Sequence, residues 1–93
     1  MKPKPILYIK PGCPWCREAV SYFSQHGLEL DIRDVNQSQQ NMQRMVEVSG
    51  QSLTPTFEWD DFVVADFSVD EFLEELEQHP DLKRELGFGD YEQ

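Results

Sequence analysis

Residues 6–16 read Ile-Leu-Tyr-Ile-Lys-Pro-Gly-Cys-Pro-Trp-Cys, and this stretch sets the beginning of the fold. Its first four residues form a short apolar run that predicts a buried strand, and Lys10-Pro11-Gly12 ends that strand. Pro14 suits the first turn of a helix, because it has no N–H that would lack a partner there. The stretch therefore predicts a strand, a turn and a helix that begins directly after Cys13.

The next forty residues continue this alternation of strands and helices. Four apolar side chains after Pro14 are spaced as one face of a helix: Cys16, Ala19, Val20 and Phe23. Gly27 suits the left-handed position that follows a helix. The apolar side chains of Leu28, Leu30 and Ile32 alternate with charged ones, which predicts a half-buried strand over residues 28–33. Ser38 then caps a second helix that ends at Ser49-Gly50, with Met42, Met45 and Val46 expected on its inner side and Val48 as a further candidate.

The last third of the chain predicts a hairpin and a further helix. A strand containing Phe57 and Trp59 turns at Asp60-Asp61 and returns over residues 62–65. Ser68 and Glu71 have the spacing of a capping box at the start of a helix. That helix packs through four apolar residues and is closed by Pro80: Val69, Phe72, Leu73 and Leu76. Residues 81–86 predict one more helical turn, and residues 87–93 are expected to be loose.

The order β-α-β-α-β-β-α predicts a thioredoxin-type α/β fold. A helix that joins two parallel strands crosses over right-handed, and the hairpin completes a four-stranded mixed sheet with helices on both faces. The 93 residues have room for one domain. We expect its core to span about residues 6–79, with residues 80–93 as a C-terminal extension.

Charge divides the chain into two unlike halves. Residues 1–46 carry six basic and four acidic side chains, whereas residues 47–93 carry two basic and fourteen acidic ones, for a net charge of −10. This balance argues against binding to nucleic acid, which needs cations against phosphate, and against anionic membranes. The apolar run at residues 6–9 is too short for a signal peptide, so we expect a cytoplasmic protein.

The two cysteines, three residues apart, favour redox chemistry over a structural role. A loop this short constrains the unfolded chain little when it is closed by a disulfide. The helix start places Cys13 near free N–H groups and the positive end of the helix dipole, which lowers a thiol pKa from about 8.5 toward roughly 3.5–7.5. Lys10 adds a cation nearby, whereas Cys16 lies one turn deeper on the buried face. The pair is therefore expected to combine an exposed nucleophile with a sheltered resolving thiol.

Metal binding is the alternative use of such a pair. Structural zinc takes four ligands, yet there is no third cysteine, and His26 and His79 lie far from Cys16 in the sequence. An iron–sulfur cluster shared between two chains stays open, although Pro14 stiffens the loop against it. We expect no bound metal.

The residues around the cysteines resemble the glutaredoxin family. Lys10–Cys16 is similar to the family pattern K-x-x-C-P-Y-C, with Trp15 in place of tyrosine, and Gly50–Pro55 is similar to G-x-x-T-V-P. The resemblance runs from about Ile6 to His79. It implies a cis Pro55 that faces Cys13, where Thr54 offers its backbone to a bound peptide. It also implies glutathione contacts from Lys10, Trp15, Phe67 and Ser68.

Four of these residues have a simpler alternative role. Pro55 is otherwise a turn proline, Lys10 a solvated lysine and Trp15 a partly exposed aromatic that shields Cys13. Ser68 is otherwise only a helix cap. Two departures from the family pattern affect glutathione binding, namely Asp66 in place of a glycine and Met42 in place of a polar residue. Asp66 either pairs with the γ-glutamyl amine or repels the neighbouring carboxylate.

The resemblance implies a monomeric thiol–disulfide oxidoreductase with Cys13 and Cys16 as its catalytic residues. It reduces protein disulfides or glutathione mixed disulfides, with glutathione as co-substrate and no bound cofactor. The two departures also resemble glutaredoxin-like electron donors that are reduced by thioredoxin reductase. Two other kinds of protein stay open: a binding protein that carries an iron–sulfur cluster, and a non-catalytic adaptor whose acidic half docks a basic partner.

Overall fold

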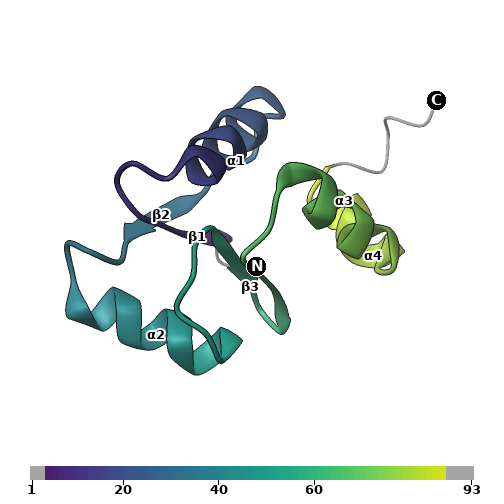
Figure 1. The fold of residues 1–93 in the computed structure, drawn as a ribbon. Coiled ribbons are helices and arrows are strands. Elements are labelled where there is room, and N and C mark those ends of the chain that lie inside the picture. The colour runs from purple at the N-terminus through teal and green to yellow at the C-terminus, as the bar shows by residue number, and fades with distance from the viewer. Residues whose placement is uncertain (1–3, 88–93) are drawn as a thin grey trace.

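A computed structural model describes residues 4–87 of the chain (Figure 1). Its elements follow the predicted order: β1 Ile6–Ile9, α1 Pro14–Gln25, β2 Asp31–Asp34, α2 Gln39–Ser49, β3 Thr56–Trp59, β4 Phe62–Ala65, α3 Val69–Glu77 and α4 Pro80–Glu85. The loose segment predicted at the C-terminus lies, from residue 88 onward, outside the described residues. Within residues 4–87, no helix is both long and apolar enough to cross a bilayer.

The four strands form one mixed sheet in the order β2-β1-β3-β4. β1 runs parallel to β2, with Leu7 beside Ile32, and antiparallel to β3, with Leu7 beside Phe57. β3 and β4 form the predicted hairpin, in which Asp60 takes a left-handed conformation (φ 56°) at the turn. Figure 1 shows α1 and α2 on opposite sides of the sheet. The predicted α/β fold with helices on both faces is confirmed.

Each face of the sheet has its own apolar cluster. The larger cluster joins the sheet to α1, α3 and α4 and contains seven residues that are at most 3% exposed: Leu7, Ala19, Phe23, Phe57, Phe67, Phe72 and Leu76. Leu86, which directly follows α4, is also buried in it. The smaller cluster lies under α2 and consists of Tyr8, Val35 and Met45, with Ile6 and Met42 packed beside them. The Cys13 end of β1 is thereby held between two packed layers.

One strand boundary and two predictions about burial are wrong. The second strand begins at Asp31 rather than residue 28, and Ile32 is 46% exposed. β2 lies at the edge of the sheet, so the helices that bury Leu7 leave its neighbour Ile32 uncovered. In α2 the fully buried side chain is that of Met45, and the next residue, Val46, is 41% exposed. The buried contact face of α2 is therefore narrower than its apolar residues suggested.

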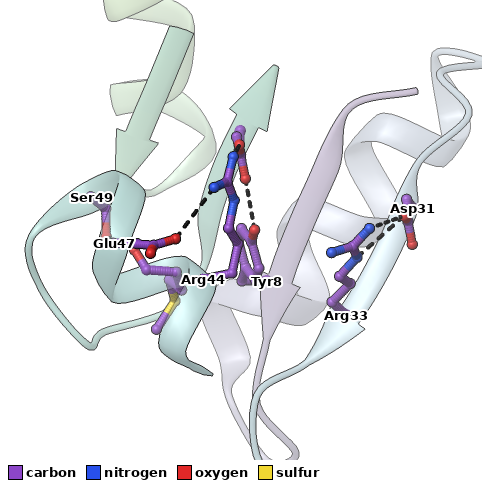
Figure 2. Close-up of polar contacts among 8 residues, drawn as sticks. Tyr8, Asp31, Arg33, Arg44, Glu47 and Ser49 are labelled. Atoms are coloured by element: carbon purple, nitrogen blue, oxygen red, sulfur yellow. Dashed lines mark hydrogen bonds and ion pairs between the residues drawn. The ribbon is translucent and has the colours of Figure 1, made fainter. Parts of the chain in front are cut away.

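A buried polar group on the α2 face was not predicted. Glu58 is only 7% exposed. Its side chain accepts a hydrogen bond from the Tyr8 hydroxyl (2.7 Å) and forms an ion pair with Arg44 Nη2 (2.8 Å). Figure 2 shows Tyr8 and Arg44 approaching each other from β1 and α2. A buried carboxylate needs such partners to offset its desolvation. The group therefore anchors α2 to the middle of the sheet.

We expect a Tyr8→Phe variant to lose part of the alkaline pH dependence of stability. Burial and the hydrogen bond to Glu58 raise the pKa of Tyr8 well above its ordinary value. Because the unfolded chain releases this proton near pH 10, the stabilisation is complete below about pH 10 and declines as the pH rises further. Urea unfolding at a series of pH values should give a shallower decline above about pH 10 for the variant, with about 1 kcal/mol lost at pH 7. Parallel curves above pH 10 would contradict the assignment.

Candidate active site

Cys13 is the capping residue of α1, as the sequence predicted. Its backbone is extended (φ −92°, ψ 110°), Pro14 follows at the first helical position, and its sulfur accepts a hydrogen bond from Cys16 N (3.2 Å). The side chain of Cys13 therefore occupies the place where a helix N-terminus stabilises negative charge. Cys16 is 3% exposed on the inner side of α1, whereas Cys13 is only half-buried. The predicted asymmetry of the pair is present in the fold.

The loop before β3 faces the sulfur of Cys13 from the other side. The Thr54–Pro55 peptide bond is cis, which confirms the isomer implied by the motif at residues 50–55. Thr54 Oγ1 lies 3.7 Å from Cys13 Sγ as a hydrogen-bond donor, and Thr54 O lies 3.9 Å from the same sulfur as an acceptor. Two segments 41 residues apart in the sequence thus meet at one sulfur atom.

The surroundings push the pKa values of the two thiols in opposite directions. Desolvation alone would raise the pKa of Cys13. Hydrogen bonds from the Cys16 side chain, the Cys16 and Trp15 backbones and the Thr54 side chain together outweigh it and hold that pKa below its ordinary value. Burial and the hydrogen bond with Cys13 raise the pKa of Cys16. Ionisation at neutral pH therefore favours Cys13, the thiol that a substrate can reach.

The six predicted contact residues fall into three groups around the cysteines. Thr54 lies at the sulfur, and Pro55 follows it through the cis peptide bond. Lys10 contacts the pair through its backbone, which hydrogen-bonds Cys16 and lowers the pKa of that thiol. The other three, Trp15, Phe67 and Ser68, line one hollow of about 310 Å³ together with Asp66 and Glu71. Trp15 is 55% exposed there.

Ser68 forms the capping box predicted for α3. Its hydroxyl accepts a hydrogen bond from Glu71 N (3.2 Å), and its backbone N–H donates to Glu71 Oε1 (2.9 Å). The Ser68 N–H is therefore already bonded to a carboxylate of the same chain. Asp66, beside it, is exposed and takes a left-handed conformation (φ 52°). The hollow next to the dithiol thus contains two acidic side chains.

Sequence reasoning missed the parts that Gln51 and Glu71 take in this site. Glu71 was predicted as a helix cap but not as a residue that lines the hollow, although the S-x-x-E spacing already placed its carboxylate at Ser68. Gln51 makes four hydrogen bonds around the loop that carries Thr54: its side chain bonds Ser49, Leu53 and Thr56, and its backbone carbonyl accepts one more from Ser49. No local pattern signals such a role. Across residues 4–87, no three His, Cys, Asp or Glu side chains gather as a metal site requires.

Comparisons with known proteins agree with this geometry. The family model for glutaredoxin matches residues 6–64. No curated protein matches the sequence of the chain. The crystal structure of a thioredoxin-like protein is similar with a TM-score of 0.69 and 27% sequence identity, over 81% of this chain and 97% of that one.

Two solved glutaredoxin structures are also similar. The glutaredoxin of Brucella melitensis, with 27% identity, covers 95% of this chain and 92% of its own at a TM-score of 0.63. The glutaredoxin of Archaeoglobus fulgidus has a TM-score of 0.66 over 80% of this chain and 85% of its own. At 15% identity the archaeal protein supports the shared fold alone.

Proposed function

The chain belongs to the glutaredoxin family, a family of thiol–disulfide oxidoreductases, and we propose that it reduces protein disulfides and glutathione mixed disulfides through Cys13 and Cys16. The observation that carries this proposal is the position of the Cys13 sulfur. It caps α1, accepts a hydrogen bond from Cys16 N and faces Thr54. This arrangement favours a thiolate at the one sulfur of the pair that is open to substrate.

The first step is attack by the Cys13 thiolate on one sulfur of a substrate disulfide. A bond forms between Cys13 and that sulfur while the substrate S–S bond breaks, and the released thiolate takes up a proton. Cys16 then loses its proton and attacks Cys13, which forms the Cys13–Cys16 disulfide and releases the second substrate thiol. Two electrons pass from the pair to the substrate, and the pair is left oxidised.

Glutathione completes the cycle in this proposal. One glutathione thiolate opens the Cys13–Cys16 disulfide and forms a mixed disulfide with Cys13. A second glutathione attacks the glutathionyl sulfur, releases oxidised glutathione and restores the Cys13 thiolate. Lys10 and the Trp15 hollow are the proposed contacts for the tripeptide, and Thr54 with Pro55 is proposed to align its cysteine. We place this cycle in the cytoplasm, on a monomer without a bound cofactor.

A second candidate, in which thioredoxin reductase supplies the electrons, is favoured by the acidic hollow. The Ser68 N–H, a donor that suits a carboxylate at the start of α3, is bonded to Glu71 instead. The Asp66 side chain adds a second negative charge beside it. A γ-glutamyl carboxylate would meet repulsion at this position, whereas a protein reductase has no such group to place there.

We expect a comparison of reductants to separate the two candidates. NADPH oxidation is measured with glutathione and glutathione reductase, and separately with thioredoxin reductase alone, using one protein disulfide as substrate. The first candidate predicts turnover with glutathione. Turnover with thioredoxin reductase and none with glutathione would refute the first candidate and support the second.

Charge-removing variants make this comparison sharper. Asp66→Asn suits the left-handed backbone, and Glu71→Gln preserves the capping box. Each should raise kcat/KM for glutathione about two- to fivefold, a modest gain because both carboxylates are exposed and screened. The matched control is Asp70→Asn, which removes a charge from the same helix turn but does not line the hollow. If Asp70→Asn raised kcat/KM for glutathione equally, the gain would come from the overall charge of the protein and not from the hollow.

A further inference from the structure

The loop of residues 50–55 connects α2 to β3 and presents Thr54 to the sulfur of Cys13. We propose that Gln51 is a positioning residue for the dithiol, because its side chain holds this loop in the shape that places Thr54 against Cys13. The proposal rests on the thiol–disulfide chemistry proposed above and names a residue outside the cysteine motif that tunes it.

The amide group of Gln51 makes three hydrogen bonds. Gln51 Nε2 donates to Ser49 Oγ (2.8 Å) and to Thr56 Oγ1 (3.1 Å), and Gln51 Oε1 accepts from Leu53 N (2.7 Å). Ser49 belongs to the last turn of α2, where Figure 2 shows it, and Thr56 is the first residue of β3. One side chain thus ties together the two elements that the loop connects, as well as the loop itself.

These bonds fix the backbone on both sides of Thr54. On the N-terminal side, Leu53 N is held by Gln51, and Leu53 O accepts a hydrogen bond from Thr56 Oγ1 (2.9 Å). On the C-terminal side, Pro55 and Thr56 are buried, and Thr56 is 0% exposed. Thr54 lies between these two fixed points, so its hydroxyl has little freedom to leave the sulfur.

The contact between Thr54 and Cys13 is sensitive to such support. Thr54 Oγ1 is 3.7 Å from Cys13 Sγ, near the long end of hydrogen bonds to sulfur, so a small displacement of the loop removes it. A hydroxyl that donates to the sulfur stabilises the thiolate over the thiol. Loss of the Gln51 bonds is therefore expected to weaken the thiolate without any change in the Cys13-Pro14-Trp15-Cys16 segment.

The test is a Gln51→Met variant, which keeps the length of the side chain but removes all three hydrogen bonds. The rate of alkylation of Cys13 by iodoacetamide is followed against pH in the full chain, with mass spectrometry to assign the labelled residue. We expect the midpoint of this profile to rise by about half a unit to one unit relative to wild type. The matched control, Gln43→Met, changes an exposed residue of α2 and should leave the midpoint unchanged.

A double-mutant cycle separates positioning from general destabilisation. In a Thr54→Val background the hydroxyl is absent, so Gln51→Met should produce no further shift of the midpoint, even if it lowers the melting temperature. A full additional shift in that background, or an unchanged midpoint in folded Gln51→Met, would overturn the proposal. If Gln51→Met does not fold, Ser49→Ala is the second variant, because it removes one hydrogen-bond partner of the Gln51 amide. It should also raise the midpoint of the alkylation profile. An unchanged midpoint in Ser49→Ala would equally overturn the proposal. Wild-type protein without turnover would instead refute the proposed function itself.

Discussion

A Cys13→Ser variant is expected to show no turnover above background with any disulfide substrate. A serine hydroxyl at the start of α1 would receive the same hydrogen bonds, but it stays protonated at neutral pH and cannot form a mixed disulfide. Cys16, which is 3% exposed, is too sheltered to replace it. The measurement is NADPH-coupled reduction of a protein disulfide and of a glutathionylated peptide. Residual turnover in this variant would show that Cys13 is not the attacking thiol.

Cys16→Ser provides the contrast that identifies the role of each sulfur. Without the resolving thiol, Cys13 can still accept a glutathionyl group and pass it to free glutathione. The variant should therefore retain part of the deglutathionylation activity, lose protein-disulfide reduction and accumulate a mixed disulfide visible by mass spectrometry. Equal loss of both activities in both variants would contradict the one-thiol route. Circular dichroism of each variant checks that the fold is retained.

Features set by neighbouring residues were predicted well from the sequence. The helix start at Pro14 follows from a proline that needs no hydrogen-bond partner, and the cap at Ser68 follows from the four-residue motif Ser68–Glu71. The hairpin at Asp60-Asp61 is equally local. Such signals act within a few residues, so they hold whatever the rest of the chain does.

Burial on the sheet faces required information that the sequence does not display locally. Ile32 follows the alternation of a half-buried strand, yet its exposure depends on β2 being an edge strand. Glu58 alternates with apolar neighbours and looks like a solvent-facing residue of its strand. It is buried because α2 covers that face and because Tyr8, fifty residues earlier, donates a hydrogen bond to it. The exposure of Ile32 and the burial of Glu58 therefore both depend on the order of the strands in the sheet.

The candidate site divides in the same way. The cysteine pair and its helix position could be predicted, because both are contained in residues 13–16. The approach of Thr54 to Cys13 was implied by a family resemblance rather than by local rules. The supporting role of Gln51 depends on bonds to Ser49 and Thr56, and these bonds form only when α2 and β3 are in place.

The core prediction with the largest expected effect concerns Phe72 of α3, which is 0% exposed. Its ring centre lies 5.0 Å from that of Phe23 in α1 and 4.8 Å from that of Phe57 in β3, so it joins two helices to the sheet. Phe72→Ala should lower the free energy of unfolding by about 3–5 kcal/mol, through lost burial and the cavity that remains. For a small domain with a total of about 5–15 kcal/mol, this loss is a large share of the stability.

Urea unfolding of reduced protein measures this loss, and Leu73→Ala is the matched control on the same helix. Leu73 is only half-buried, so we expect that change to cost about 1–2 kcal/mol. The two variants also differ in what they disturb, because Phe72 contacts Phe67 (ring centres 5.3 Å apart), which lines the hollow beside Trp15. At temperatures where both variants are folded, Phe72→Ala should therefore also lower the rate of turnover with glutathione, relative to Leu73→Ala. Equal costs for the two substitutions would mean that the aromatic cluster holds α3 less tightly than its packing indicates.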